Sequence, residues 1–367
     1  MRIGIDTRMF SMSGIGTYLR NLIEGLGELD RNNEYILIMH PSDIINFTLP
    51  GSNFTIIPSS ARPYSLSEQI VLPRVVHKLG LDLIHYPHYF QPVFGRTPVV
   101  VTIHDMIHQL FPEFCPSYLH WKISWLMIKR VVRRSRIVLT VSKNSANDLT
   151  ERLEVSKEKV RVIYNSLPKN WGSSSDKTIP LSLKDFLAER PYFLYVGNHK
   201  LHKNIPFLLK AFSNLKMKNE HITLVLTGDS KSFQPLISSL SLSSHVFFLG
   251  NINLESLQSI YSNAHALVLP SFYEGFGLPA LEAMSLGIPP IVSDAGSLPE
   301  VVADAGIVFP VSDMPALERA MFEIIEDAKL RNDLSKKCLE RAASFSLSES
   351  ARQTLSSYRD AVENYKG

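Results

Sequence analysis

The sequence predicts an α/β protein made of two doubly wound domains, each with a parallel sheet between layers of helices. Three observations lead to this prediction. Short apolar runs rich in β-branched residues alternate with helical or loop stretches. The alternation occurs once in each half of the chain. A chain of 367 residues is also long enough for two domains, each with its own core.

Most of the predicted strands of the first domain are apolar runs rich in β-branched residues, as expected for strands buried on both faces. A helix is predicted at about 15–29, and Ser142 is placed to cap another helix that ends near residue 153. Ligands of such sheets collect at the carboxyl ends of the strands. The predicted strands are 2–5, 35–39, 54–57, 82–86, 99–103, 137–141 and 160–164.

The second domain repeats the alternation. Ser346 precedes a last helix that reaches about residue 365, and the Gly-, Ser- and Pro-rich stretch 168–180 marks a linker. The predicted strands are 192–196, 221–227, 246–249 and 266–270, followed by a strand, turn and short helix at 291–300. The other predicted helices are 205–215, 255–263 and 314–343.

Composition limits the classes of function. A net charge of +3 at pH 7 is too small to indicate a nucleic-acid partner. Cys115 and Cys338 are the only cysteines and lack metal-site spacing, which fits a reducing compartment. The N-terminus begins a strand without the apolar run of a signal peptide, and no apolar stretch is long enough to span a bilayer. We therefore expect a cytoplasmic protein.

The segment 271–284 follows an apolar run and carries the most specific pattern in the chain. We predict a strand, a glycine-rich turn and a helix, with Pro279 as the first helical residue because its missing N–H costs nothing there. The turn leaves backbone N–H groups without helical partners at the positive end of the helix dipole, where they can bind an anion. These amides belong to Phe276, Gly277 and Leu278, and Gly275 and Gly277 have no side chain that would hold a ligand away.

Two carboxylates, Glu274 and Glu282, border this turn. Carboxylates accept paired hydrogen bonds from hydroxyls, so amides beside two acids suit a sugar nucleotide. The alternative is that Glu282 only favours the helix dipole and Gly-Phe-Gly is only a tight turn. The segment Pro-Ser-Phe-Tyr-Glu-Gly-Phe-Gly-Leu-Pro-Ala-Leu-Glu-Ala-Met at 270–284 favours the first interpretation. It resembles the Glu-x7-Glu motif of the family 4 retaining glycosyltransferases, which have the GT-B fold.

The resemblance covers nearly the whole chain and implies a domain organisation. It implies two Rossmann-like domains facing a central cleft, joined by a linker at 171–185. The first, 1–170, would be the acceptor side, and the second, 186–345, would hold most of the sugar nucleotide. The C-terminal helix, 346–367, would cross back to the first domain.

The resemblance also implies roles for residues of the second domain. Glu282 would bind the ribose hydroxyls and Glu274 the sugar. The amides of Phe276 and Gly277, with Lys203, would bind the diphosphate. Catalysis would then be mostly electrostatic, because the leaving nucleoside diphosphate gains negative charge as the glycosidic bond breaks. The sugar nucleotide is a substrate, and no cofactor is implied.

Lys203 stands near a predicted helix start, after a strand that ends in Gly197. Its ammonium would add to the charge of the helix end, whereas the alternative is an ordinary solvated lysine. Many relatives carry an arginine next to that glycine, where this chain has Asn198 in the predicted phosphate site. The residues that could replace the missing charge are His199, Lys200 and His202.

Two residues of the first domain complete the predicted site. His104 follows a strand and resembles the family's histidine that hydrogen-bonds a hydroxyl of the transferred sugar. A structural role is the default for the other histidines, His85, His88 and His108. Gly16 lies at a helix start that faces the cleft in the family, although a plain structural turn would explain it equally well.

The segment 117–136 combines tryptophans with lysines and arginines, and no acidic residue occurs from Cys115 to Asn147. Such a helix can lie on an anionic membrane, with tryptophan at the level of the headgroups. An ordinary amphipathic helix with a solvated basic rim is the alternative. The one-sided charge favours peripheral membrane binding.

Within the family, the chain most resembles bacterial O-antigen and polysaccharide mannosyltransferases. This favours transfer of mannose from GDP-mannose to an oligosaccharide or polyprenyl-linked acceptor. A UDP- or dTDP-sugar donor, a nucleotide-sugar epimerase and a non-catalytic sugar-nucleotide-binding protein remain alternatives. The paired acids also leave a glycosidase open, although the glycine turn and Lys203 argue against it. No Asp-x-Asp motif follows a strand, so we predict no metal.

Overall fold

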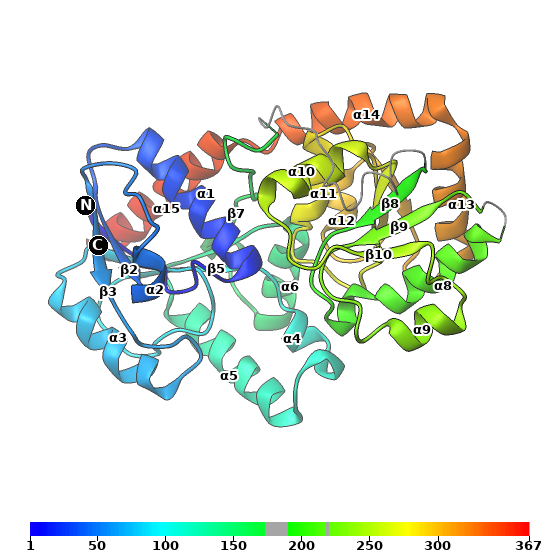
Figure 1. The fold of residues 1–367 in the computed structure, drawn as a ribbon. Helices are drawn as coiled ribbons and strands as arrows, with labels where there is room; N and C mark the ends of the chain where they lie inside the picture. Colours follow the sequence, from blue (N-terminus) through cyan, green and yellow to red (C-terminus); the bar gives the residue numbers. More distant parts are fainter. Residues whose placement is uncertain (173–189, 218–219, 367) are drawn as a thin grey trace. The chain divides into compact units, whose positions relative to one another are not determined.

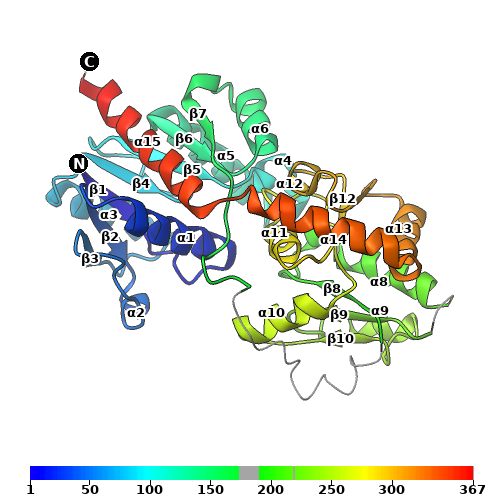
Figure 2. The same cartoon turned by 90° about the horizontal axis from the view of Figure 1, so that it is seen from above.

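A computed structural model describes residues 1–172, 190–217 and 220–366, and the chain divides into two compact units. Unit 1 comprises Met1–Pro168 and Phe345–Gly367, and unit 2 comprises Lys169–Ser344. Each unit has its own parallel sheet with helices on both faces (Figures 1 and 2), which confirms the predicted α/β class. The predicted linker lies outside the described residues from 173 onward.

The sheet of unit 1 has the order β3-β2-β1-β4-β5-β6-β7, and all its pairs are parallel. Ile5 of β1 lies between Leu37 on one side and His85 on the other. The strand order therefore reverses at β1 and β4, which is where doubly wound sheets bind ligands. The strands are β1 (Arg2–Asp6), β2 (Glu34–Met39), β3 (Phe54–Pro58), β4 (Leu83–Tyr86), β5 (Val99–Ile103), β6 (Ile137–Thr140) and β7 (Val160–Val162).

Two apolar clusters cover the two faces of this sheet. One joins α1 (Ser13–Leu29) to α15 (Leu347–Lys366), so the predicted return of the C-terminal helix is confirmed, with Leu355 and Tyr358 in the core. The other contains residues of the helices on the opposite face. Those helices are α3 (Leu66–Lys78), α5 (Tyr118–Arg134) and α6 (Lys143–Leu153). The short helices of unit 1 are α2 (Pro41–Ile44), α4 (Ile107–Leu110), η1 (Pro112–Phe114) and η2 (Lys157–Lys159).

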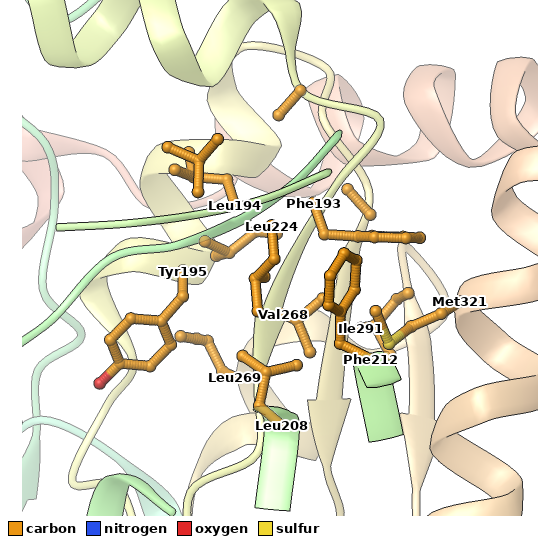
Figure 3. Close-up of a cluster of buried hydrophobic side chains, with 14 of the residues drawn as sticks. Phe193, Leu194, Tyr195, Leu208, Phe212, Leu224, Val268, Leu269, Ile291 and Met321 are labelled. Carbon is orange, nitrogen blue, oxygen red and sulfur yellow. The ribbon is translucent and has the colours of Figure 1, made fainter. Parts of the chain in front are cut away.

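The sheet of unit 2 has the order β10-β9-β8-β11-β12-β13, again with parallel pairs. Its order reverses between β8 and β11. Figure 3 shows the core between this sheet and its helices, with Phe212 of α8 and Met321 of α13 packed on the strands. The strands are β8 (Tyr192–Tyr195), β9 (Thr223–Leu226), β10 (Val246–Phe248), β11 (Ala266–Leu269), β12 (Pro290–Ser293) and β13 (Ile307–Phe309), of which β13 was not predicted.

The helical stretch predicted at 314–343 is two helices, because Asp327 ends the first and caps the second. The Asp327 carboxylate accepts a hydrogen bond from the backbone N–H of Leu330 at 2.8 Å. The helices of unit 2 are α8 (Ile205–Lys216), α9 (Gln234–Ser239), α10 (Leu254–Asn263), α11 (Leu278–Ser285), α12 (Leu298–Val302), α13 (Met314–Glu326) and α14 (Ala328–Ala343), with η3 at Leu201–Lys203.

Candidate functional site

The switch point of unit 2 brings together two loops that the sequence singled out. One follows β8 and leads to Lys203, and the other follows β11 and carries Glu274. Lys203 Nζ lies 2.6 Å from Glu274 Oε1 in an ion pair. Two residues that are 71 positions apart in the sequence therefore meet where a doubly wound sheet binds its ligand.

Glu274 is held by its backbone and by one carboxylate oxygen. Its carbonyl oxygen accepts hydrogen bonds from the N–H and the hydroxyl of Ser297, at 3.1 and 3.0 Å. Besides Lys203, Oε1 also accepts a bond from the Ser271 hydroxyl at 2.8 Å. The second oxygen, Oε2, has no hydrogen-bond partner among the described residues. A fixed carboxylate with one open oxygen can accept a hydrogen bond from a ligand hydroxyl.

The glycine turn leads into α11, which begins at Leu278. Pro279 is therefore the second helical residue, one position later than predicted, because Gly277 at φ +93° is the residue before the helix. A Cβ on Gly277 would lie 2.6 Å from Leu298 Cδ2, so only glycine fits this conformation. Within the described chain, the amides of Gly277 and Leu278 have no backbone acceptor. They are placed to bind an anion at the helix start.

The remaining residues of the predicted turn flank these amides. Gly275 is partly exposed, and Phe276 is buried, with 4% of its surface exposed. The aromatic side chain thus anchors the turn in the core, and Gly277 beside it is buried as well.

Glu282 lies in the first turns of α11 beside Tyr261 of α10. The Tyr261 hydroxyl donates a hydrogen bond to Glu282 Oε2 at 2.7 Å. Burial raises the pKa of Glu282 to about 7, against the opposing effect of that hydrogen bond. In the described part of the chain, Oε1 has no partner. Glu282 is therefore a shielded carboxylate that can accept hydroxyl hydrogen bonds once it is ionised.

Asn198 shapes the turn after β8. Its side-chain oxygen accepts a bond from the Lys200 N–H at 3.2 Å, and its carbonyl accepts the Tyr195 hydroxyl at 2.8 Å. Of the residues considered for the missing positive charge, His199 donates Nε2–H to the carbonyl of Thr227 at 2.7 Å and packs on Phe233 and Phe248. His199 is thus a packing residue of the turn, whereas the Lys200 side chain is exposed.

In unit 1, His104 follows β5 at the carboxyl edge of the sheet. Its Nε2 lies 3.0 Å from the carbonyl oxygen of Pro87, which can only accept, so Nε2 carries the proton. Burial lowers the pKa of His104, against the opposing charge of Asp105. The neutral ring then offers Nδ1 as a hydrogen-bond acceptor. The Tyr18 ring meets His104 edge-on, with the two centroids 4.9 Å apart.

Gly16 lies inside α1, three residues after its start. A Cβ at this position would lie 2.2 Å from the carbonyl oxygen of Phe10. Close packing against that backbone is a sufficient reason for a glycine here. A ligand role for Gly16 remains a prediction.

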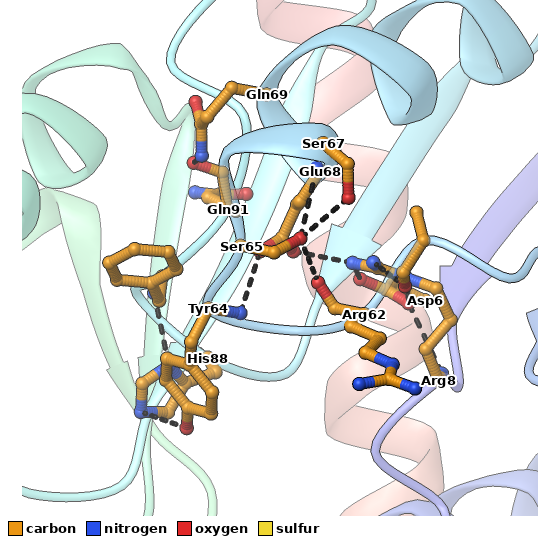
Figure 4. Close-up of polar contacts among 12 residues, drawn as sticks. Asp6, Arg8, Arg62, Tyr64, Ser65, Ser67, Glu68, Gln69, His88 and Gln91 are labelled. Carbon is orange, nitrogen blue, oxygen red and sulfur yellow. Dashed lines mark hydrogen bonds and ion pairs between the residues drawn. The ribbon is translucent and has the colours of Figure 1, made fainter.

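Sequence reasoning missed two polar groups of unit 1. In one, the buried Arg8 pairs with Asp6 at 2.7 Å and with Glu68 at 2.5 Å (Figure 4). The sequence signal was Ser65-x-x-Glu68, the pattern of a helix capping box. The other is a buried chain in which His85 links the Tyr358 hydroxyl at 2.7 Å to Thr102 at 2.8 Å, and Thr102 contacts the Tyr18 hydroxyl at 2.9 Å.

The described residues contain neither a metal-binding cluster nor a membrane-spanning helix. No three His, Cys, Asp or Glu side chains come close enough together there to hold a metal ion. Among the same residues, no helix is both long and apolar enough to cross a bilayer.

The two sheets and the site define a class of protein. Two Rossmann-like units, with a glycine turn at a helix start and two carboxylates at one switch point, are the arrangement of the GT-B fold. Residues 12–169 match the family described as Glycosyltransferase Family 4, and residues 184–341 match Glycosyl transferases group 1. The chain belongs to the family 4 glycosyltransferases.

Named relatives make the comparison more specific. The chain is 32% identical over 228 residues to the O-antigen chain mannosyltransferase RfbU of Salmonella typhimurium, a match that covers 60% of this chain and 58% of RfbU, less than two thirds of that relative. It is 30% identical over 285 residues to the O-antigen chain mannosyltransferase B of Escherichia coli, covering 76% and 74%. HepE of Anabaena, solved in complex with UDP-glucose, has the same fold with a TM-score of 0.78 at 18% identity, over 97% of this chain and 100% of HepE.

Proposed function

We propose that the protein is a retaining hexosyltransferase that moves mannose from GDP-mannose to a saccharide or lipid-linked saccharide acceptor, in cell-surface polysaccharide or O-antigen synthesis. The observation that carries the proposal is the meeting of Lys203, Glu274 and the α11 N-terminus at the switch point of unit 2. The two named O-antigen mannosyltransferases support mannose as the transferred sugar.

The residues of unit 2 account for binding of the donor. The amides of Gly277 and Leu278, with Phe276 beside them, would hold the diphosphate, and Lys203 would add a positive charge. Glu282 would accept hydrogen bonds from the ribose hydroxyls, and Glu274 Oε2 from a hydroxyl of the sugar. These fixed groups oppose the charge that develops on the leaving nucleoside diphosphate.

The reaction proposed is a displacement on one face of the sugar. The bond from the anomeric carbon to the phosphate oxygen breaks, and the bond to the acceptor oxygen forms on the same face. The acceptor's proton goes to the departing phosphate, so no protein base and no metal is required. His104 would accept a hydrogen bond at Nδ1 from a hydroxyl of the transferred sugar, because its Nε2 is used by Pro87.

A ligand panel tests the donor, because a compound that binds only the folded protein raises its melting temperature. We expect GDP to raise it more than UDP or dTDP. With GDP-mannose and an oligosaccharide acceptor, we expect an α-linked product by NMR, formed equally well in EDTA. Faster nucleotide release from UDP-glucose than from GDP-mannose would show that UDP-glucose is the donor. The HepE complex with UDP-glucose supports this alternative.

The same assay separates the other candidate functions. An epimerase would convert the donor with no acceptor present. A glycosidase would release reducing sugar from an oligosaccharide without any nucleotide. A non-catalytic binding protein would bind GDP but yield no product with any acceptor.

We also propose that the protein works in the cytoplasm, where free thiols such as Cys115 and Cys338 persist, and that α5 binds an anionic membrane. On the outward side of α5, the exposed fractions of Leu119, Ile123 and Leu126 are 65%, 42% and 59%. Exposed basic residues flank this ridge, namely Lys122, Lys129, Arg130 and Arg133. An apolar ridge between cations fits a lipid surface with anionic headgroups.

The tryptophans of α5 have a different position from the one predicted for headgroup contact. The indole N–H groups of Trp121 and Trp125 both donate to the carbonyl of Gln109, at 3.1 and 3.2 Å. Sedimentation with phosphatidylglycerol vesicles tests the surface. Leu119→Ser combined with Leu126→Ser should weaken binding at least fivefold, whereas Trp121→Phe should leave it within twofold. Equal sedimentation of the double variant and the unaltered protein would remove α5 as the contact.

A further inference from the structure

We propose that an aromatic platform in unit 1, formed by Tyr64, His88 and Phe90, binds a hexopyranose ring of the acceptor. This inference rests on the proposed function, since a transferase of this kind needs an acceptor subsite. It adds the residues that form the subsite and the face of the sugar that they contact.

The three rings lie next to each other at the carboxyl edge of the sheet. The Tyr64 ring is 5.3 Å from the His88 ring and 5.2 Å from the Phe90 ring, centroid to centroid. Half of the Tyr64 surface, 50%, is exposed, while His88 and Phe90 are partly exposed. Figure 4 shows Tyr64 and His88 side by side. Aromatic rings grouped with a few polar atoms are typical of ligand sites.

The backbone of Tyr64 is strained, and a buried network holds it in place. Its φ is +63°, in the left-handed region that a bulky side chain rarely adopts. The Tyr64 N–H donates to Glu68 Oε2 at 3.0 Å, and Glu68 is itself fixed by the buried Arg8. Strain that persists because its surroundings enforce it is concentrated at functional sites. Here its effect is to present an aromatic ring to solvent.

The polar atoms of the platform suit the rim of a sugar. His88 Nδ1 accepts the Phe90 N–H at 3.0 Å, so the neutral ring carries its proton on Nε2. That Nε2 faces the Tyr64 hydroxyl at 3.5 Å. With His88 as its donor, the Tyr64 hydroxyl is left to donate to a ligand. A hexopyranose has an apolar C–H face for the ring and hydroxyls at its rim for this donor.

The platform also lies next to the predicted catalytic-region histidine. His104 Nε2–H donates to the carbonyl of Pro87, the residue immediately before His88. A sugar on the platform would therefore lie beside His104. This position fits the acceptor residue that receives the transferred sugar.

Saturation-transfer NMR on the full chain tests the inference, with methyl α-D-mannopyranoside as the probe. Tyr64→Leu should reduce the sugar's signal at least fivefold, whereas Phe94→Leu, at another aromatic that is 66% exposed in the same unit, should keep it within 1.5-fold. Tyr64→Gly is the folding control. It relieves the positive φ, so the melting temperature should hold or rise while the signal is lost.

The outcomes distinguish this inference from the proposed function. Signals that persist in Tyr64→Leu and Tyr64→Gly, or a sugar that gives no signal with the unaltered protein, would overturn the platform. If GDP still raised the melting temperature in that case, the proposed function would stand. If no nucleotide raised it while the signal depended on Tyr64, the transferase proposal would fail and the saccharide site would remain.

Discussion

Lys203 Nζ lies 2.6 Å from Glu274 Oε1, and the two side chains are shielded from water, with exposed fractions of 14% and 12%. The pair joins the loop after β8 to the loop after β11. Before a ligand binds, the lysine's charge is balanced by this carboxylate. Because an ammonium has three donors, Lys203 can keep Glu274 in place and still bind a phosphate oxygen.

Removing one member of this pair should destabilise unit 2 more than removing both. Lys203→Met leaves a shielded carboxylate unpaired, and we expect it to lower the free energy of unfolding by about 2 kcal/mol. In Lys203→Met with Glu274→Gln, much of that loss should return. A double-mutant cycle by urea unfolding should therefore give a coupling energy of about 1–2 kcal/mol. Additive effects would show that the pair contributes no net stability.

The same variants should separate binding from transfer. Lys203→Met should weaken GDP binding about tenfold, because a charge-assisted contact to the diphosphate is lost. Glu274→Gln should leave GDP affinity within threefold and reduce turnover, since Glu274 is assigned to the sugar. Calorimetry with GDP and product analysis measure the two effects. Equal loss of GDP affinity in both variants would contradict this division of roles.

GDP affinity should rise with pH because of Glu282. Burial raises the pKa of Glu282 to about 7, so its ionised fraction grows about tenfold between pH 6 and pH 8. The ionised carboxylate accepts hydrogen bonds from the ribose hydroxyls more strongly than the neutral acid does, because its charge strengthens them. Calorimetry should therefore show that GDP affinity rises up to about tenfold more between pH 6 and pH 8 in the unaltered protein than in Glu282→Gln. That variant is the control, because the phosphates of GDP still titrate in its presence. Parallel profiles for the two proteins would refute the assignment.

Tyr261→Phe provides a second check on the same carboxylate. The Tyr261 hydrogen bond lowers the pKa of Glu282, so its loss should move the binding transition to higher pH. The folded pKa lies above the unfolded value of about 4.5, so the folded state holds more protons between the two. Without nucleotide, the contribution of Glu282 to the free energy of unfolding should thus fall as pH rises from about 4.5 to about 7.

Unit 1 should lose stability in acid because His85 is buried as a neutral ring. Burial first, and then the neighbouring His104, lower the pKa of His85 to about 3, whereas the unfolded value is near 6.5. The unfolded chain therefore binds more protons between these values, and the free energy of unfolding falls as pH drops through them, by up to about 1.4 kcal/mol per pH unit. His85→Gln should show a shallower dependence between pH 7 and pH 5 in urea unfolding. An identical slope would mean that His85 does not titrate on unfolding.

The sequence predicted the α/β class and the residues of the glycine turn because their signals are local. Apolar runs mark buried strands, and the Gly-Phe-Gly pattern marks a turn before a helix within a few residues. Ser142 was also predicted correctly as a helix cap, since its hydroxyl accepts the Ser145 N–H at 3.0 Å. A three-residue strand such as β13 gives too short a pattern, and it was missed.

Contacts between distant segments could not be predicted from a single sequence. The link between Lys203 and Glu274 depends on β8 and β11 being neighbours, which only the sheet order provides. The Tyr358–His85 contact spans 273 positions and depends on the return of α15. No sequence pattern marked Tyr64. The feature that distinguishes it is a positive φ, which is imposed by tertiary contacts and cannot be predicted from neighbouring residues.

Gly296→Ala should displace Glu274 and abolish most of the transfer activity. An added Cβ would lie 2.5 Å from the Glu274 carbonyl oxygen and 2.7 Å from its nitrogen, which are backbone atoms that cannot move aside without shifting the loop. Gly296 also has a φ of +61°. We expect a loss of about 3 kcal/mol in the free energy of unfolding and a drop in kcat of at least 100-fold.

Gly250→Ala is the matched control for this substitution. Gly250 is in the same unit and has the same φ of +61°, but an added Cβ there would meet nothing within 4 Å. It should therefore cost only the left-handed backbone penalty, about 1 kcal/mol. The two variants therefore differ only in the steric clash between a Cβ at residue 296 and the Glu274 backbone. The differences in their free energies of unfolding and in their transfer rates measure the effect of that clash. If both alanines cost the same and Gly296→Ala kept full activity, the close packing of the 294–298 turn would have no part in positioning that carboxylate.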